Sequence, residues 1–411
     1  MLVREAKLLN GTKEQYKALD DAIRTAQFVR NKALRHWMDN RGVGKTELYA
    51  LCKELAAQFP WAKKLNSAAR QASAERAWQS ISTFYSRCKK KEKKKGYPKF
   101  KKHCRSVEYK VSGWKLSSDC MRIAFPDGFN IGTLSLYCNK ETQEDLFRLK
   151  INRVRVVRRA DGYYAQFCLD ADRKEPGEYT GNVIGLDLGL KYFYKDQNDN
   201  AVVYPQYFRR AQKRLKKQQR RLSRKFDKSR KPQSNNYHKA RKRLGKTHLK
   251  IQRQRKDWAI KLARCVVASH DVVVYEDLKV SNLVKNHHLA KSISDASWSQ
   301  FTQWLNYYGK IWDKAVVAVS PHYTSQDCSH CGQRVQKSLN TRTHSCSHCQ
   351  VEICRDTNAA INILKKGMKI LGLEWPDSTF GQKESASSEG KHGEKTTSTV
   401  DRQLQTASGF V

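Results

Sequence analysis

The chain has 411 residues, with 80 Lys and Arg against 39 Asp and Glu, which gives a formal net charge of +41. Such a chain repels itself unless a polyanion neutralises it, and nucleic acid is the favoured partner because contacted phosphates release condensed counterions. The 39% of hydrophobic residues exclude a disordered chain. We find no apolar run of roughly eighteen residues and no signal-peptide layout, so we do not expect a membrane protein. Many cysteines are scattered singly along the chain, which indicates a reducing cytoplasm.

The N-terminal part is predicted to be helical. Residues 12–38 place apolar side chains at a three/four spacing, and Thr12 with Gln15 has the spacing of a capping box. The same periodicity predicts two further helices over residues 46–58 and 66–88.

A run of nine lysines, KKKEKKKGYPKFKK (89–102), follows the third helix and encloses Tyr97 and Phe100. One interpretation of this run is a solvated, flexible connector. Because aromatic side chains interleaved with positive charge are typical of nucleic-acid contacts, we favour a segment that contacts phosphates.

Residues 106–170 alternate apolar and polar side chains in short stretches, which predicts strands. The stretch VRVVRRADGYYAQFCL (154–169) is typical of a hairpin, because Asp161-Gly162 tolerates a turn with positive φ. We therefore predict a small β-barrel or sheet here, followed by a linker at 170–181.

The second half alternates strands with helices. Residues 206–269 are predicted to form basic helices with so few acids for pairing that we favour a face that binds the nucleic-acid backbone over a solvated surface. The other predicted elements are a strand and hairpin at 182–205, a strand at 271–278, a helix at 297–312 and a strand at 314–320. Beyond about Leu373 the hydrophobic period ends, which predicts a disordered tail.

Two Cys-x2-Cys pairs, Cys328/Cys331 and Cys346/Cys349, are separated by fourteen residues. This is close to the spacing of a four-cysteine zinc ribbon, and four thiolates leave no open position for a catalytic water. We therefore predict that these four cysteines bind a structural Zn²⁺.

Three nearby residues offer alternative zinc ligands. His330 and His348 lie inside the two pairs and could substitute, but we expect both to be exposed. Cys354 follows the second pair, and a buried side chain is a better interpretation of it than a fifth ligand.

Three acids stand out by position. Asp187 interrupts the apolar strand VIGLDLG, Glu276 closes the apolar run VVVY, and Asp356 lies where a helix begins. Each has an ordinary explanation, since Asp187 could end a strand, Glu276 could start a loop and Asp356 could be a helix N-cap. Together they fit the order of strands and helices in an RNase H-like core, where two neighbouring strands and a C-terminal helix bring three acids together.

Phosphodiester hydrolysis needs an activated water and a stabilised leaving oxygen. Two Mg²⁺ ions about 4 Å apart supply both, and carboxylate oxygens hold them. We therefore predict that Asp187, Glu276 and Asp356 are catalytic and bind two Mg²⁺. Asp277 neighbours Glu276 but would point to the opposite face of a regular strand.

Five motifs, in chain order, resemble the RuvC-type nuclease of the transposon-encoded TnpB family, a relative of the compact type V CRISPR effectors. They are GLDLG (185–189), VVVYEDLKVSNL (272–283), SISDASWSQF (292–301), SPHYTSQDCSHCG (320–332) and RDTNAAINI (355–363). Members of this family are RNA-guided DNA endonucleases whose RNA comes from the transposon end and that recognise a short target-adjacent motif.

The resemblance implies roles and partners. Asp187, Glu276 and Asp356 would be the metal-binding acids, and the zinc ribbon would be an insert between the last core strand and the last acid. The implied partners are a guide RNA derived from the transposon end and target double-stranded DNA, with no small-molecule substrate. The implied location is the prokaryotic cytoplasm, at the nucleoid when DNA is bound.

The implied fold is α+β and multidomain, with an RNase H-like (RuvC) nuclease core, a four-cysteine zinc-ribbon insert, an N-terminal helical domain and a small β-barrel wedge domain. The corresponding segments are a first wedge strand (1–10), a helical recognition domain (11–104), the wedge (105–181), the nuclease domain in two parts (182–321 and 353–372), the zinc insert (322–352) and the tail (373–411).

Two positions depart from the family pattern. Cys354 stands where the family usually has Asp before Arg355-Asp356, so a polar contact that supports the third acid could be missing. Ile260 stands where relatives often carry His. Neither change removes a catalytic carboxylate.

Other functions remain open. A nuclease-inactive RNA-guided DNA-binding regulator would be expected to lack acids that this chain keeps. An RNA-independent RuvC-like nuclease has no need of the zinc insert and the large basic helical parts. A DDE transposase fits less well, because only the three acids suggest it.

Overall fold

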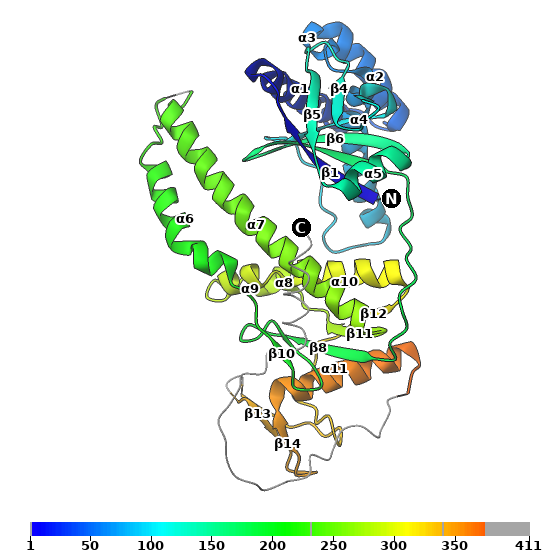
Figure 1. Cartoon of the computed structure of the whole chain (residues 1–411), viewed down its shortest axis with the longest axis vertical. Coiled ribbons are helices and arrows are strands. Elements are labelled where there is room, and N and C mark those ends of the chain that lie inside the picture. Colours follow the sequence, from blue (N-terminus) through cyan, green and yellow to red (C-terminus); the bar gives the residue numbers. More distant parts are fainter. Residues whose placement is uncertain (1, 231, 339–340, 375–411) are drawn as a thin grey trace. The chain divides into compact units, whose positions relative to one another are not determined.

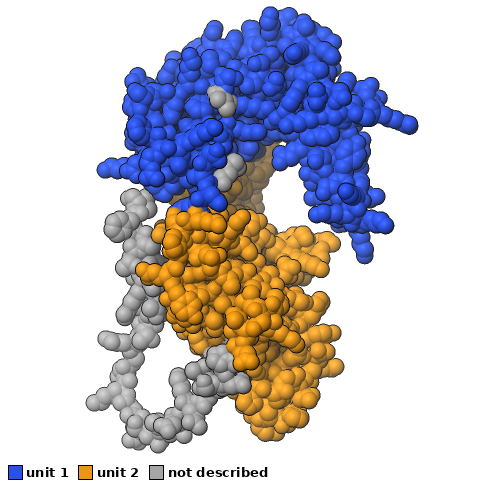
Figure 2. Space-filling model, turned by 90° about the vertical axis from the view of Figure 1, so that its right-hand side faces the viewer, with its two compact units in different colours: residues 1–173 blue, residues 174–411 orange. Residues whose placement is uncertain are grey.

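The computed structural model describes residues 2–230, 232–338 and 341–374. The chain divides into two compact units, residues 1–173 and 174–411, which Figure 2 colours separately. Each unit combines helices with a β-sheet, as an α+β chain requires. From residue 375 onward the predicted tail lies outside the described residues, and the division into seven segments remains a prediction. Within the described ranges no helix is long and apolar enough to cross a membrane.

The first unit contains the helices α1 (Lys13–Asp39), α2 (Lys45–Gln58), α3 (Pro60–Lys63) and α4 (Ser67–Lys89). The predicted capping box starts α1, because the Thr12 hydroxyl accepts from the Gln15 amide while the Gln15 side chain accepts from the Thr12 amide. The apolar stripe of α1 is buried as its period requires, with Leu19, Val29 and Leu34 fully enclosed. The three predicted helices are therefore confirmed.

The lysine-rich segment after α4 is anchored along α1 at its C-terminal end. Asn31 pairs twice with the backbone of Lys101, since its Nδ2 donates to the carbonyl and its Oδ1 accepts from the amide, each at 3.0 Å. One turn earlier, Gln27 donates to the Lys102 carbonyl and accepts from the Cys104 amide. The exposed lysines here thus project from a backbone that α1 holds in place, which favours a contact surface over a free connector.

A seven-stranded antiparallel sheet forms the rest of the first unit, in the order β2-β6-β7-β1-β5-β4-β3. Its strands are β1 (Leu2–Leu9), β2 (Ser106–Tyr109), β3 (Lys115–Leu116), β4 (Arg122–Phe125), β5 (Gly132–Tyr137), β6 (Ile151–Arg159) and β7 (Gly162–Leu169). The hairpin predicted at 154–169 is confirmed as β6 and β7, and the positive φ of 142° at Gly162 closes its turn.

The expected β-barrel is wrong, because among the described residues this sheet stays open. Closure would require the edge strands β2 and β3 to pair with each other, and instead β2 packs against α4 and leads into the 3₁₀ turn η1 (Val111–Gly113). The strand pattern also missed helix α5 (Lys140–Arg148), which Asn139 caps by accepting from the Thr142 amide.

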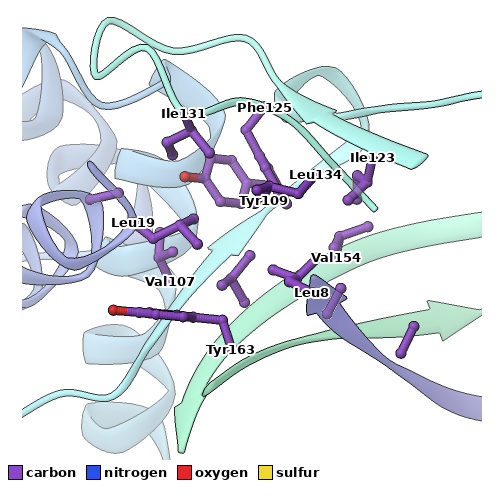
Figure 3. Close-up of a cluster of buried hydrophobic side chains, with 14 of the residues drawn as sticks. Leu8, Leu19, Val107, Tyr109, Ile123, Phe125, Ile131, Leu134, Val154 and Tyr163 are labelled. Atoms are coloured by element: carbon purple, nitrogen blue, oxygen red, sulfur yellow. The ribbon is translucent and has the colours of Figure 1, made fainter. Parts of the chain in front are cut away.

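One core of the first unit lies between α1 and the sheet (Figure 3), and a second lies among α1, α2 and α4. The Leu19 side chain of α1 reaches into a cluster of residues that lie on the strands or, for Ile131, directly before β5. The labelled members of that cluster are Leu8, Val107, Tyr109, Ile123, Phe125, Ile131, Leu134, Val154 and Tyr163. Because β1 comes from the very start of the chain and pairs with both β5 and β7, it joins the two halves of the sheet.

The second unit is built on a five-stranded mixed sheet with the order β10-β9-β8-β11-β12. The strands are β8 (Val183–Leu188), β9 (Tyr194–Lys195), β10 (Ala201–Val202), β11 (Val272–Glu276) and β12 (Ala315–Val319). The first three are antiparallel neighbours, whereas β8, β11 and β12 run parallel. Parallel strands are buried on both faces, which explains their continuous apolar runs.

Helices cover both faces of this sheet (Figure 1). On one face, α7 (Asn235–Ser269) and α10 (Trp298–Trp312) pack on Ile184, Leu186 and Val273. On the other face, α11 (Arg355–Leu371) packs on the alternate residues Val272 and Val274. The sheet is thus the middle of three layers.

The predicted basic helices are α6 (Tyr207–Ser223) and α7, which form a long hairpin extending away from the sheet (Figure 1). A small apolar seam that includes Leu215, Leu244 and Ile251 holds them together. The short helices α8 (Val280–Leu283) and α9 (Ala290–Ala296) follow β11. Asp295 of α9 accepts hydrogen bonds from the Phe208 and Arg209 amides, at 2.9 and 3.1 Å, and so fixes the start of α6.

Candidate functional site

Two of the three predicted acids stand at the carboxyl ends of neighbouring parallel strands. β8 and β11 are in register up to the pair Leu186 and Tyr275, so the next position along each strand sets Asp187 beside Glu276. Lateral neighbours in a sheet face the same side, and here that side is the one covered by α11. Glu276 is 7% exposed, and Asp187 is half-buried.

Helix α11 brings the third acid to the same edge by packing very close to the sheet. A Cβ on Gly185 would lie 2.4 Å from the carbonyl oxygen of Ala360, so only glycine permits this approach. Asp356 lies one helical turn before Ala360, and Asp187 lies one strand repeat after Gly185. The glycine contact therefore brings the two carboxylates toward each other.

The electrostatics show that the three acids share one environment. Burial, together with the nearby carboxylates of Glu276 and Asp356, raises the pKa of Asp187 well above its usual range. Burial also raises the pKa of Glu276, while the Thr324 hydroxyl and the Lys366 ammonium oppose that rise. The group therefore holds an excess of negative charge that a cation would offset.

Glu276 is oriented by a residue that sequence reasoning missed. The Thr324 hydroxyl, which is buried, donates to Glu276 Oε1 at 2.7 Å and lies in the loop after β12. Two asparagines of α11 hold that loop, because Asn362 donates to the Thr324 and Asp327 carbonyls while Asn358 donates to Asp327. The signal that could have found them is the i, i+4 spacing of Asn358 and Asn362 within an otherwise apolar helix face.

Asp356 is the second residue of α11 and not its N-cap, so the ordinary explanation for this acid is wrong. The cap position is Cys354. The Asp356 carboxylate instead pairs with the Arg355 guanidinium at 3.0 Å and lies 3.9 Å from that of Arg342. The Cys354 thiol is 3.1 Å from Lys195 Nζ, so a polar contact is present where one could have been missing.

The three carboxylates form a more open group than a single-ion cage. Across the described residues, the four cysteines are the one set of at least three potential ligands whose donor atoms all lie within 4.8 Å of one another. The acids nevertheless offer hard oxygen donors and uncompensated charge, which is the donor set that Mg²⁺ prefers. Their donor chemistry thus fits a hard divalent cation.

The four predicted cysteines form one cluster, whose sulfur atoms all lie within 4.8 Å of one another. Cys328 Sγ lies 3.6 Å from Cys349 Sγ, and Cys331 Sγ lies 3.6 Å from Cys346 Sγ. His330 and His348 are exposed, as expected. The thiol of Cys354, which is half-buried, contacts Lys195 and does not join the cluster.

Both cysteine pairs sit on the same backbone turn. In each turn the first cysteine amide donates to the carbonyl five residues on, and the amide four residues on donates back to the cysteine carbonyl. The residues are Cys328 with Gly332 and Gln333, and Cys346 with Gln350 and Val351. The residue four positions after the first cysteine has a positive φ in both turns, 79° at Gly332 and 59° at Gln350. This backbone conformation explains the glycine after the first pair.

The cysteine cluster leads directly to the third acid. The short strands β13 (Thr343–Ser345) and β14 (Glu352–Cys354) pair antiparallel, and α11 starts where β14 ends. The Arg355 amide also donates to the Arg342 carbonyl at 2.7 Å, which continues the pairing into the helix start. The fold of this insert therefore determines where Asp356 is placed.

A strongly positive surface covers the α6–α7 hairpin. A cleft on α6 is lined by Lys213, Lys216, Lys217, Arg220, Arg221 and Arg224. A second cleft between the two helices is lined by Gln218, Arg221, Arg224, Lys225, Asn236, Lys239, Ala240 and Arg243. Neither lining contains a carboxylate, so this hairpin face is suited to phosphates.

Comparison with protein families finds two models that match consecutive parts of the chain. Residues 166–287 match OrfB_IS605, described as a probable transposase, and residues 298–363 match the Cas12f1-like TNB domain. The first match contains Asp187 and Glu276, and the second contains the four cysteines and Asp356.

Relatives match over most of the chain. A Streptomyces pristinaespiralis protein named "Putative RNA-guided DNA endonuclease" is 28% identical over 377 residues, which cover 87% of each chain. InsQ of Escherichia coli (strain K12), named in the same way, is 27% identical over 84% of this chain and 87% of its own. The TnpB-like protein L79 of Acanthamoeba polyphaga mimivirus is 30% identical over 132 residues, 31% of this chain and 25% of its own.

Among solved structures, the fold resembles the protein of the Cas12f1–sgRNA–target DNA complex. The TM-score is 0.54 at 14% sequence identity, over 86% of this chain and 83% of that one. The two family models, the full-length relatives and this fold agree with one another. The chain is therefore similar to the OrfB_IS605 (TnpB) family over residues 166–287, to the Cas12f1-like TNB domain over residues 298–363, and to these relatives over most of its length.

Proposed function

We propose that this chain is an RNA-guided DNA endonuclease of a transposable element. It binds a guide RNA derived from the transposon end and hydrolyses phosphodiester bonds of double-stranded target DNA next to a short target-adjacent motif. The observation that carries the proposal is the meeting of Asp187, Glu276 and Asp356 at one sheet edge. The names of the two full-length relatives support it, as does the RNA and DNA in the Cas12f1 complex.

The strand order of the second unit supports an RNase H-like (RuvC) core. Numbered within the unit, the sheet runs 3-2-1-4-5, with the first three strands antiparallel and the last two parallel to the first. In such an arrangement the first and fourth strands are neighbours. An acid from each, here Asp187 and Glu276, can therefore face one phosphodiester.

Asp187, Glu276 and Asp356 would hold two catalytic Mg²⁺ ions. When bound, the ions would supply a nucleophilic water and stabilise the leaving oxygen. The chain's own residues orient the ligands: Thr324 fixes the Glu276 carboxylate, and Arg355 and Arg342 turn that of Asp356. The neighbouring negative charge that raises the pKa of Asp187 would also attract Mg²⁺, so metal ions would compete with protons for these oxygens.

Cys328, Cys331, Cys346 and Cys349 would hold one structural Zn²⁺. Their four sulfur atoms lie close enough for one tetrahedral ion, and they fill its coordination. The metal would fold the insert between β12 and α11 and thereby fix the start of α11. Its contribution to cleavage would be through the position of Asp356.

The guide RNA and the target DNA would bind to the positively charged surfaces of the chain. The α6–α7 clefts would bind the phosphate backbone, while base pairing between guide and target reads most of the sequence. The lysine-rich segment held on α1 in the first unit would add further phosphate contacts. We place the activity in the cytoplasm, at the nucleoid when DNA is bound.

The experiment that tests this function is to express the full chain beside its native flanking DNA and to sequence the RNA that co-purifies. One discrete RNA with a constant scaffold and a 3′ end running into variable flanking sequence is expected. That complex should then cut a matched DNA when Mg²⁺ is supplied. A mixture of unrelated cellular RNAs would refute guided recognition and favour an RNA-independent nuclease.

A further inference from the structure

The strand beside the first acid carries a buried lysine. Lys195 of β9 is the direct antiparallel partner of Asp187, and residues opposed in this way project from the same face of a sheet. Lys195 is 8% exposed. A buried ammonium is costly unless it is paired, so its partners indicate what it does.

The partners of Lys195 connect the β9–β10 hairpin to the start of α11. Its Nζ lies 2.5 Å from Asp199 Oδ1, at the hairpin tip, and 3.1 Å from Cys354 Sγ, at the cap position of α11. The hydroxyl of Thr357, in the first turn of α11, donates to the same Oδ1 of Asp199. One ion pair therefore contacts α11 at two places.

Those two places enclose the third acid. Cys354 lies two residues before Asp356, and Thr357 lies one residue after it. Arg355 and Arg342 contact the Asp356 carboxylate itself, whereas the Lys195–Asp199 pair contacts neither of its oxygens. The pair thus acts on the backbone that carries the carboxylate.

We infer that Lys195 and Asp199 are positioning residues, which hold the first turn of α11 against the sheet so that Asp356 stays beside Asp187 and Glu276. The inference rests on the proposed function, because it assigns Asp356 to the cleavage site. The ordinary alternative is that the pair only stabilises the hairpin. In that case its loss would lower the melting temperature without a local effect on the start of α11.

Two variants disrupt the contacts between the Lys195–Asp199 pair and α11 at different points. Lys195→Met keeps the length of a buried side chain and removes the charge. Thr357→Val keeps the shape and removes the hydroxyl, and it remains informative if Lys195→Met fails to fold. Thr357→Ser is the conservative partner of the second variant, and Lys191→Met is the matched control, because Lys191 is an exposed lysine in the loop between β8 and β9.

The first measurement is native-state hydrogen exchange on the full chain, followed over the amides of residues 355–364. If the pair positions α11, these amides should exchange at least about tenfold faster in Lys195→Met and in Thr357→Val. They should exchange at the wild-type rate in Thr357→Ser and Lys191→Met. Amides of α1, in the other unit, serve as the internal reference.

The second measurement is cleavage by the RNA-loaded protein as a function of Mg²⁺ concentration. The midpoint should move upward by at least about fivefold in the two disrupting variants, while RNA binding stays unchanged. Wild-type exchange and a wild-type midpoint in both variants would overturn the inference. If Asp356→Ala itself cuts at the wild-type rate, the proposed function is what fails, so the two failures are distinguishable.

Discussion

The hydroxyl of Thr324 donates to Oε1 of Glu276 at 2.7 Å, across 48 positions of the chain, and both side chains are buried. This bond stabilises the ionised carboxylate, whereas burial favours the protonated one. The balance between the hydrogen bond and the burial determines what fraction of Glu276 is ionised, and so able to bind a metal ion, at neutral pH.

Removing this hydroxyl should shift the pH dependence of cleavage. In Thr324→Val the pKa of Glu276 should rise further, so less of it is ionised at a given pH and the acidic limb of the rate profile moves to higher pH. A buried bond to a charged group is worth about 1.5–3 kcal/mol, which corresponds to roughly one to two pH units. Rates between pH 5 and about pH 8 would measure the shift.

The direction of this shift has a second check. Protons and metal ions compete for the same oxygens, so raising the Mg²⁺ concentration should return the limb toward lower pH. Thr302→Val, which removes a threonine hydroxyl from α10, is the control and should leave the profile in place. A Thr324→Val profile that coincides with the wild type would contradict the assigned role of this bond.

The cysteine cluster should bind one zinc ion per chain. Cys346→Ser should lose the zinc and most of the cleavage, because an insert without its metal cannot fix the start of α11. Metal content by mass spectrometry and the melting curve would measure both effects. Cys88→Ser, which removes a half-buried cysteine outside the cluster, should keep the zinc. Zinc retained by Cys346→Ser would count against the cluster.

The α6–α7 surface should be visible in the salt dependence of RNA binding. Replacing four cleft residues by Gln should weaken binding and flatten the plot of log K against log salt by roughly 0.7–0.9 per lost phosphate contact. The four are Lys213, Lys217, Arg220 and Arg224. The matched control replaces four exposed lysines outside these clefts, Lys285, Lys291, Lys310 and Lys369. If the cleft variant and the control variant gave equal slopes, RNA binding would depend on total charge and not on the position of these residues.

The close packing of α11 on β8 predicts an unusually sensitive glycine. Gly185→Ala would place a Cβ 2.4 Å from the Ala360 carbonyl oxygen, and α11 would have to move away. Overpacking of this kind costs about 1–3 kcal/mol of the free energy of unfolding, and the displaced Asp356 should reduce cleavage as well. Chemical denaturation and a cleavage assay would measure both. A variant with wild-type stability and rate would show that this contact is loose.

Much of the site could be predicted from local pattern. A carboxylate within the apolar strand around Asp187 is costly when it is unpaired, and together with Glu276 and Asp356 its position indicated a shared site. The spacing of the two Cys-x2-Cys pairs pointed to the four cysteines that the structure gathers into one cluster. The capping box at Thr12 and the hairpin turn at Asp161 are likewise local signals, and the structure contains both.

The remainder depends on contacts between distant residues, which periodicity does not record. Thr324 looks like an ordinary loop residue, and Lys195 lies 159 positions from the Cys354 thiol that it meets. Whether alternating strands close into a barrel depends on the pairing of the edge strands, which a pattern of period two leaves undetermined. The short helix α5 has only two buried residues, too few to outweigh the surrounding strand pattern.

If Asp187, Glu276 and Asp356 form an RNA-guided cleavage site, the loss of one of these acids should abolish cleavage and leave nucleic-acid binding intact. The most direct test loads wild-type chain and Asp187→Ala with the same co-purified RNA and supplies matched DNA with Mg²⁺. The wild type should cut the matched DNA and spare an unmatched one, while Asp187→Ala should bind RNA and DNA equally well and should not cut. Cleavage by Asp187→Ala at the wild-type rate would contradict this assignment.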